Sequence, residues 1–131
     1  MMPLLIGSAL GAVLILTLYR LGALQDRSGM AVLLGAIALF WPVFAFQAQA
    51  SVLTIALHCA IFLAFSAVAA YGFKTSATII AAGIIAHGVF DALTLLTGHP
   101  GPIWWPAICG GLDIVAGTLL LFLIKSNRIP A

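Results

Sequence analysis

Charged side chains are scarce in this chain, which has 131 residues of which only 6% are Asp, Glu, Lys or Arg. A soluble domain normally carries about 25%, so these few charged groups would not cover a globule of this size in water. Five bases and three acids give a net charge of +2, too small for a nucleic-acid-binding surface. Two cysteines are too few for a disulfide framework. These shortages exclude soluble, nucleic-acid-binding and disulfide-framework proteins, and leave an integral membrane protein.

Hydrophobic residues are abundant instead, at 64% of the chain, and the mean hydropathy is +1.26. Four polar or glycine- and proline-rich interruptions separate five apolar stretches, each close to the ~20 residues that a helix needs to span a bilayer. No alternating pattern suggests the strands of a closed barrel. The sequence therefore predicts a single domain over residues 1–131, an all-α compact bundle of five transmembrane helices. We expect spans near 4–24, 30–46, 52–71, 77–96 and 107–124.

The basic residues predict the orientation of this bundle. With five spans, all five bases fall on one side: Arg20, Arg27, Lys74, Lys125 and Arg128. Because cytoplasmic loops carry an excess of Lys and Arg, we expect the N-terminus outside and the C-terminus in the cytoplasm. The three tryptophans, Trp41, Trp104 and Trp105, then lie towards the outer interface, and we interpret them as an aromatic belt.

The polar residues inside the predicted spans gather in the outer half of the membrane. Asp91 and Asp113 are two of only three acids, and His58 and His87 are two of only three histidines; the third, His99, lies in the outer loop. At a helix rise of 1.5 Å per residue, the four intramembrane residues lie ~8 to ~14 Å below the outer ends of their spans. A carboxylate at the helix centre costs roughly 2.5–3.5 kcal/mol, so such a group needs a partner or a function.

Spacing predicts which of these residues meet. His87 and Asp91 are four residues apart and share one helix face. The fourth and fifth spans are expected to be antiparallel neighbours, with small residues that allow close approach, so Asp91 and Asp113 lie at nearly equal depth. We therefore predict that His87, Asp91 and Asp113 converge in one cavity, with His58 or His99 completing it.

Imidazole and carboxylate groups are the ligand set of Zn(II) and non-haem Fe(II). One hypothesis is therefore a metal-dependent hydrolase or oxidoreductase that acts on a lipid or another apolar substrate. Its metal ligands would be His58, His87, Asp91 and Asp113, with His99 and Asp113 in catalytic roles. The competing interpretation is structural: the side chains hydrogen-bond one another, and Asp113 is neutral or paired with His58.

Other functions remain open from the sequence. His58 and His87 could ligate a haem in an electron-transfer module, and a chain with so little extramembrane mass also suits an accessory subunit of a larger complex or a homo-oligomer. A transport path is less favoured, because few polar residues line the inner half. Cys59 and Cys109 could be free, bonded to each other, or, for Cys109, a metal ligand.

A family resemblance runs through residues 86–117. The chain carries H-x3-D at His87 and Asp91, G-H-P around His99, and W-P-x2-C-x3-D ending at Cys109 and Asp113. This pattern resembles a family of small bacterial multi-pass membrane proteins that share a domain of unknown function. The resemblance implies that these five residues act together in a protein of the bacterial inner membrane, and it implies no reaction.

Overall fold

The computed structural model describes residues 1–131 as five helices and no strands. The helices are α1 (Met2–Arg20), α2 (Arg27–Gln47), α3 (Val52–Thr75), α4 (Ala77–Thr97) and α5 (Trp105–Lys125). Each is long and apolar enough to cross a membrane; at 1.5 Å per residue they measure about 28–36 Å. The prediction of a compact all-helical bundle with five helices is confirmed, and the chain has the character of an integral membrane protein.

Helix α2 begins at Arg27, ahead of the apolar stretch that starts near residue 30. The Asp26 carboxylate accounts for this, because it accepts a hydrogen bond from the backbone N–H of Ser28 at 2.8 Å and another from the Ser28 hydroxyl. A side chain that accepts from the first turn stabilises a helix N-terminus. The hydrogen bond from the Ser28 hydroxyl, followed by that from its N–H, holds the pKa of Asp26 below its ordinary value.

The connections on either side of α4 differ in length. Ser76 alone separates α3 from α4, and a Cβ at Gly72 would lie 2.6 Å from a side-chain carbon of Ile80, so α3 and α4 meet closely at this turn. At its other end α4 stops at Gly98, whose φ of 87° lies in a region that residues with side chains rarely adopt. The loop of residues 98–104, which carries His99, follows this break.

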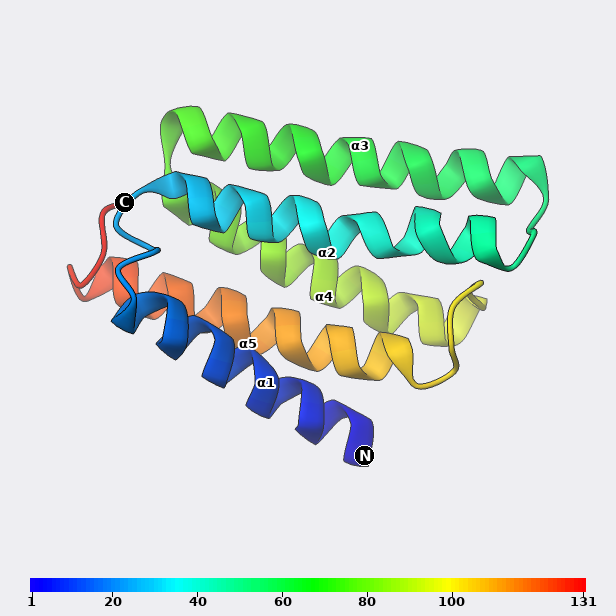
Figure 1. The fold of residues 1–131 in the computed structure, drawn as a ribbon, viewed down its shortest axis with the longest axis horizontal. Coiled ribbons are helices and arrows are strands. Elements are labelled where there is room, and N and C mark those ends of the chain that lie inside the picture. Colours follow the sequence, from blue (N-terminus) through cyan, green and yellow to red (C-terminus); the bar gives the residue numbers. More distant parts are fainter.

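The helices pack in successive layers (Figure 1). Helix α5 lies between α1 and α4 and makes extensive contacts with both. Helices α2 and α3 pack on each other and on the other side of α4. Consecutive helices run in opposite directions, so α4 and α5 are the antiparallel neighbours that the sequence predicts.

All five bases lie at one end of the bundle, at the left of Figure 1. We call this the basic end. The bases come from the ends of the helices and from the tail after α5: Arg20 ends α1, Arg27 begins α2, Lys74 lies in the last turn of α3, Lys125 ends α5 and Arg128 follows it. The α2–α3 connection and the α4–α5 loop lie at the opposite end. Which end faces the cytoplasm stays a prediction from the positive-inside rule.

Glycines set the approach of α1 to α5. A Cβ at Gly7 would collide with the carbonyl oxygen of Ile108, and one at Gly11 with that of Leu112. The G-x-x-x-G spacing of Gly7 and Gly11 therefore allows a close helix contact. Towards the basic end the interior is apolar, with Ile15, Leu34, Ile80 and Leu120 completely buried.

Candidate metal centre

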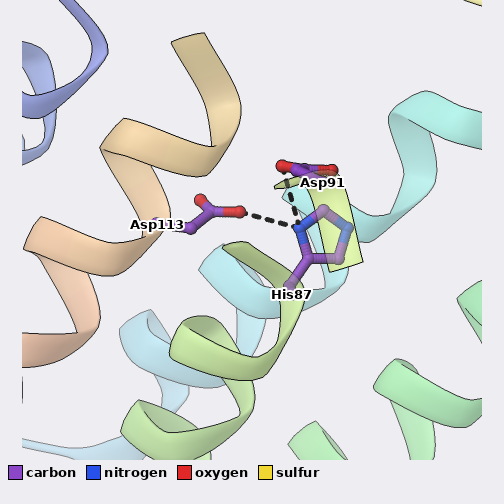
Figure 2. Close-up of side chains that lie close together, drawn as sticks. All are labelled: His87, Asp91 and Asp113. Atoms are coloured by element: carbon purple, nitrogen blue, oxygen red, sulfur yellow. Dashed lines mark hydrogen bonds and ion pairs between the residues drawn. The ribbon is translucent and has the colours of Figure 1, made fainter. Parts of the chain in front are cut away.

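His87, Asp91 and Asp113 meet inside the bundle, between α4 and α5 (Figure 2). The Nδ1 atom of His87 lies 2.7 Å from Oδ2 of Asp113 and 3.6 Å from Oδ2 of Asp91. All three side chains are buried, with exposed fractions of 1%, 0% and 0%. One ligand atom from each residue lies within 4.8 Å of the other two, so the group could hold a metal ion. The predicted convergence of these three residues is confirmed, and we call them the triad.

Two glycines bring Asp113 within reach of His87. A Cβ at Gly88 would lie 3.0 Å from Cβ of Asp113 and 3.1 Å from the carbonyl oxygen of Gly110. In the other direction, a Cβ at Gly110 would lie 3.3 Å from the carbonyl oxygen of Gly88. The two backbones therefore pass each other without intervening side chains, one residue after His87 and three residues before Asp113.

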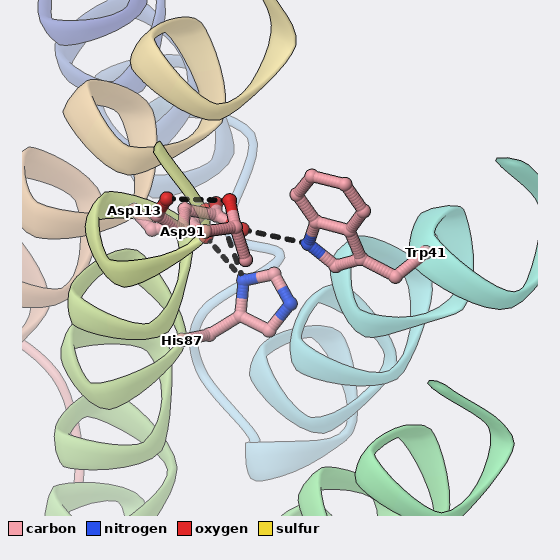
Figure 3. Close-up of polar contacts among 5 residues, drawn as sticks. Trp41, His87, Asp91 and Asp113 are labelled. Atoms are coloured by element: carbon pink, nitrogen blue, oxygen red, sulfur yellow. Dashed lines mark hydrogen bonds and ion pairs between the residues drawn. The ribbon is translucent and has the colours of Figure 1, made fainter. Parts of the chain in front are cut away.

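Trp41 joins the triad from α2. Its indole Nε1–H donates a hydrogen bond of 2.7 Å to Oδ1 of Asp91, and its side chain is only 1% exposed (Figure 3). The triad together with Trp41 therefore connects three helices, α2, α4 and α5, through buried polar contacts. A hydrogen bond to a charged group is among the stronger ones in proteins.

The aromatic-belt interpretation was wrong for Trp41, which is buried and bonded to Asp91. Trp105 is also not a simple belt residue, because its ring packs against Phe40 at 4.8 Å and Phe44 at 4.9 Å. Trp104, at 47% exposed, fits the belt. Depth was the one partial signal: Trp41 lies six residues from the end of α2, which corresponds to ~9 Å, close to the depth of Asp91. Depth does not say which face of α2 turns to α4, so this signal alone does not place Trp41 beside Asp91.

His58 and His99 lie around Trp41 rather than in the triad. The His58 ring stacks on the Trp41 ring with a centroid distance of 5.8 Å and an interplanar angle of 18°. The His99 ring meets the same indole edge-on at 5.5 Å and 68°. Neither imidazole belongs to the group of potential ligands. A ligand role for His58 and a catalytic role for His99 thus stay predictions without a direct contact to the triad.

Several polar atoms of the triad are buried without a hydrogen-bond partner: Nε2 of His87, Oδ2 of Asp91 and Oδ1 of Asp113. A single Nδ1 faces both carboxylates, and it carries at most one proton to share between them. All Lys and Arg side chains lie at the basic end, so none of them neutralises this pair of acids. The group could therefore hold a cation, which would bring positive charge to the two carboxylates.

The two cysteines are free. Cys109 is buried one helical turn before Asp113 on α5, but it is not among the residues that could hold the ion. Cys59, on α3 next to His58, is partly exposed. Neither thiol therefore changes the donor set of one imidazole and two carboxylates.

No protein family, curated protein or solved structure matches this chain. The resemblance over residues 86–117 therefore rests on its motifs alone, and the bacterial origin that it implies stays a prediction.

Proposed function

We propose that this chain is an integral membrane metalloprotein that binds one divalent cation at His87, Asp91 and Asp113. The observation that carries the proposal is the convergence of these three donors, from two helices, within 4.8 Å of one another at buried positions. One imidazole and two carboxylates are hard to place in an apolar bundle without compensation. A divalent cation would neutralise both carboxylates at once.

The donor set favours Zn(II) or Fe(II). Both metals accept imidazole nitrogen and carboxylate oxygen, and three protein ligands leave at least one coordination position open. A metal in such a site can activate water for hydrolysis or, for iron, bind oxygen. In this arrangement the negative charges of Asp91 and Asp113 would balance the positive charge of the ion. The Trp41 N–H would fix the orientation of the Asp91 carboxylate.

The environment suggests the class of substrate. The triad lies in a bundle of apolar helices suited to contact with a lipid bilayer, so a molecule that reaches it would be a lipid or another apolar compound. With the basic end in the cytoplasm, the triad would lie in the outer half of the membrane. The localisation that fits is an inner membrane of the bacterial type.

A structural role is the second candidate, and two contacts favour it. The 2.7 Å pair of His87 with Asp113 and the 2.7 Å hydrogen bond from Trp41 to Asp91 already connect α2, α4 and α5 without a metal. In that case the buried polar residues would specify how the helices pack, and the protein would suit the role of an accessory subunit in a larger membrane complex.

Elemental analysis separates the two candidates. The protein would be purified without chelator and without a nickel resin, and its zinc and iron content measured by mass spectrometry. We expect about one equivalent of one metal per chain, and its loss in Asp113→Asn, which keeps the shape of the side chain but removes the charge.

His58→Asn and His99→Asn are the matched controls, because neither residue belongs to the triad. Both variants should keep the metal. Wild-type protein that contains no metal and takes up none from added Zn(II) or Fe(II) would overturn the proposal in favour of the structural role. Equal loss of metal from the controls and from Asp113→Asn would show that the ligand set is not the triad.

A further inference from the structure

A pocket of about 520 Å³ opens between the beginning of α3 and the end of α4, beyond Trp41. It lies at the end of the bundle opposite the basic end, because its lining comes from the α2–α3 connection, the first turns of α3, the last turns of α4 and the start of the α4–α5 loop. None of the triad residues lines it. We call it the outer pocket.

Two imidazoles without hydrogen bonds line the outer pocket. His58 is only 7% exposed and contributes to its wall, and the Nδ1 atoms of both His58 and His99 are buried without a partner. Both imidazole rings pack against the Trp41 indole, His58 by stacking and His99 by an edge contact, and these contacts fix their positions. The Nδ1 atoms themselves are enclosed, whereas the Nε2 atoms of the same rings are not enclosed and also make no hydrogen bond within the chain. A ligand in the pocket would therefore contact the two rings at Nε2.

The polar part of the lining carries no Asp, Glu, Lys or Arg. Besides the imidazoles it contains the hydroxyls of Thr54, Thr94 and Thr97. Thr94 and Thr97 donate to backbone carbonyls of their own helix at 2.7 and 3.2 Å, and the Thr54 hydroxyl lies 2.9 Å from that of Ser51. Their oxygens keep lone pairs as acceptors, and a neutral imidazole has one donor and one acceptor nitrogen. This set matches an uncharged oxygen group, a hydroxyl or a carbonyl, better than an anion or a cation.

The rest of the lining is apolar and leads to the surface of the bundle. Phe90 and Ile61 line the pocket from α4 and α3, and Leu57 of α3 is 57% exposed on the face that an apolar bundle turns to lipid. An aliphatic chain can therefore extend from the two imidazoles towards the bilayer along α3. The same pocket can therefore accommodate both a polar head group and an apolar tail.

We propose that the outer pocket binds an apolar molecule with an uncharged oxygen head, such as a long-chain alcohol or ester, and that His58 and His99 hydrogen-bond this head. That the bound molecule is a substrate rests on the proposed metal centre; its binding does not. The inference assigns the two histidines to ligand recognition and leaves metal binding to the triad.

The three histidines of the chain provide a direct test. Protein with ¹⁵N-labelled histidine in lipid nanodiscs gives ring-nitrogen signals from His58, His87 and His99 alone, and single-histidine substitutions assign them. The probes are 1-decanol, methyl decanoate, decyl phosphate and decane. We expect the alcohol and the ester to shift the His58 and His99 signals in a saturable manner, with no shift at His87.

Two probes and three variants test the specificity. Decane should leave the ring nitrogens unchanged, because it has no oxygen, and decyl phosphate at pH 8 should bind at least tenfold more weakly than decanol. His58→Phe and His99→Phe should each abolish the shift at the remaining histidine. Val32→Phe, which changes a separate pocket between α2 and α3, should not.

Each contrary result has one meaning. Equal effects of decane and decanol would show that the pocket does not recognise the oxygen of the head group. Tighter binding of decyl phosphate than of decanol would show that the pocket prefers a charged head group. No shift with either alcohol or ester would overturn the pocket itself. Added Zn(II) should shift the His87 signal only. If Zn(II) leaves the His87 signal unchanged while decanol still binds, the proposed metal centre is wrong but the proposed ligand site in the outer pocket is not.

Discussion

Nδ1 of His87 on α4 and Oδ2 of Asp113 on α5 lie 2.7 Å apart, both fully enclosed by the bundle. This contact exists only because α4 and α5 pass each other at Gly88 and Gly110, where neither helix presents a side chain. The geometry of the triad therefore depends on the spacing of two backbones as much as on the three side chains. This dependence can be tested without changing a single polar residue.

Gly88→Ala should disturb the triad. The new methyl group would lie 3.0 Å from Cβ of Asp113 and 3.1 Å from the backbone oxygen of Gly110, which is tighter than nine in ten real Cβ contacts. Overpacking of this kind costs about 1–3 kcal/mol of the free energy of unfolding, which can be measured by SDS titration in mixed micelles. We also expect metal content to fall, because α5 must move away from His87.

Gly35→Ala is the control for this substitution. No atom outside its own helix lies within 4 Å of a Cβ at Gly35, and alanine is favoured over glycine in a helix interior by roughly 1 kcal/mol. This variant should be as stable as the wild type or more stable, with unchanged metal content. Equal behaviour of the two variants would contradict the close approach of α4 and α5.

Gly7→Ala combined with Gly11→Ala should weaken the bundle at another place. Both methyl groups would collide with backbone carbonyls of α5, those of Ile108 and Leu112, so α1 has to withdraw from α5. We expect a loss of about 1–3 kcal/mol per site. The metal content should stay unchanged, because α1 contributes nothing to the triad. A simultaneous loss of metal would show that α1 supports the position of α5 around Asp113.

The sequence predicts the five helices well, because a chain in lipid must satisfy every backbone hydrogen bond internally, which leaves few alternatives to apolar helices. Helix ends were harder to predict. By hydropathy, Arg27 and Ser28 belong to the polar segment before the second apolar stretch. In the structure they form the first turn of α2, because Asp26 caps the helix in front of them. Capping is a local side-chain contact that an average over hydropathy does not detect.

The triad could be predicted from spacing and depth alone. His87 and Asp91 share a face by the periodicity of the helix, and a short loop between α4 and α5 brings Asp113 to the same level. The positions of Trp41 and His58 could not be predicted in this way. Apolar residues lie on every face of α2 and α3, so the sequence does not determine which face each helix turns to α4, and only packing decides it.

Trp41→Phe should destabilise the protein more than the loss of one surface hydrogen bond would. The substitution removes the only donor that reaches Oδ1 of Asp91 and leaves that oxygen buried without a partner. Such a loss costs about 1–3 kcal/mol. Trp104→Phe, at a residue that is 47% exposed and makes no hydrogen bond, should change the free energy of unfolding by less than about 0.5 kcal/mol.

A double substitution shows whether the cost arises from the carboxylate. In metal-free protein, Trp41→Phe together with Asp91→Leu removes donor and acceptor together, and replacing both partners by apolar groups can be nearly neutral. The double variant should therefore be more stable than Trp41→Phe alone. Additive losses would mean that the indole acts through packing against His58 and His99 instead of through its N–H.

The orientation of the bundle can be tested with a matched pair of cysteines, Gln25→Cys and Gln47→Cys, in a background without Cys59 and Cys109. Both glutamines are exposed: Gln25 lies in the α1–α2 connection at the basic end, and Gln47 is the last residue of α2 at the opposite end. Because cytoplasmic loops retain the excess of Lys and Arg, an impermeant maleimide added to intact bacterial cells should label position 47, and position 25 only after permeabilisation. Labelling in the reverse order would place the basic end outside. The triad and the outer pocket would then lie in the cytoplasmic half of the membrane, and a molecule would enter the outer pocket from that side.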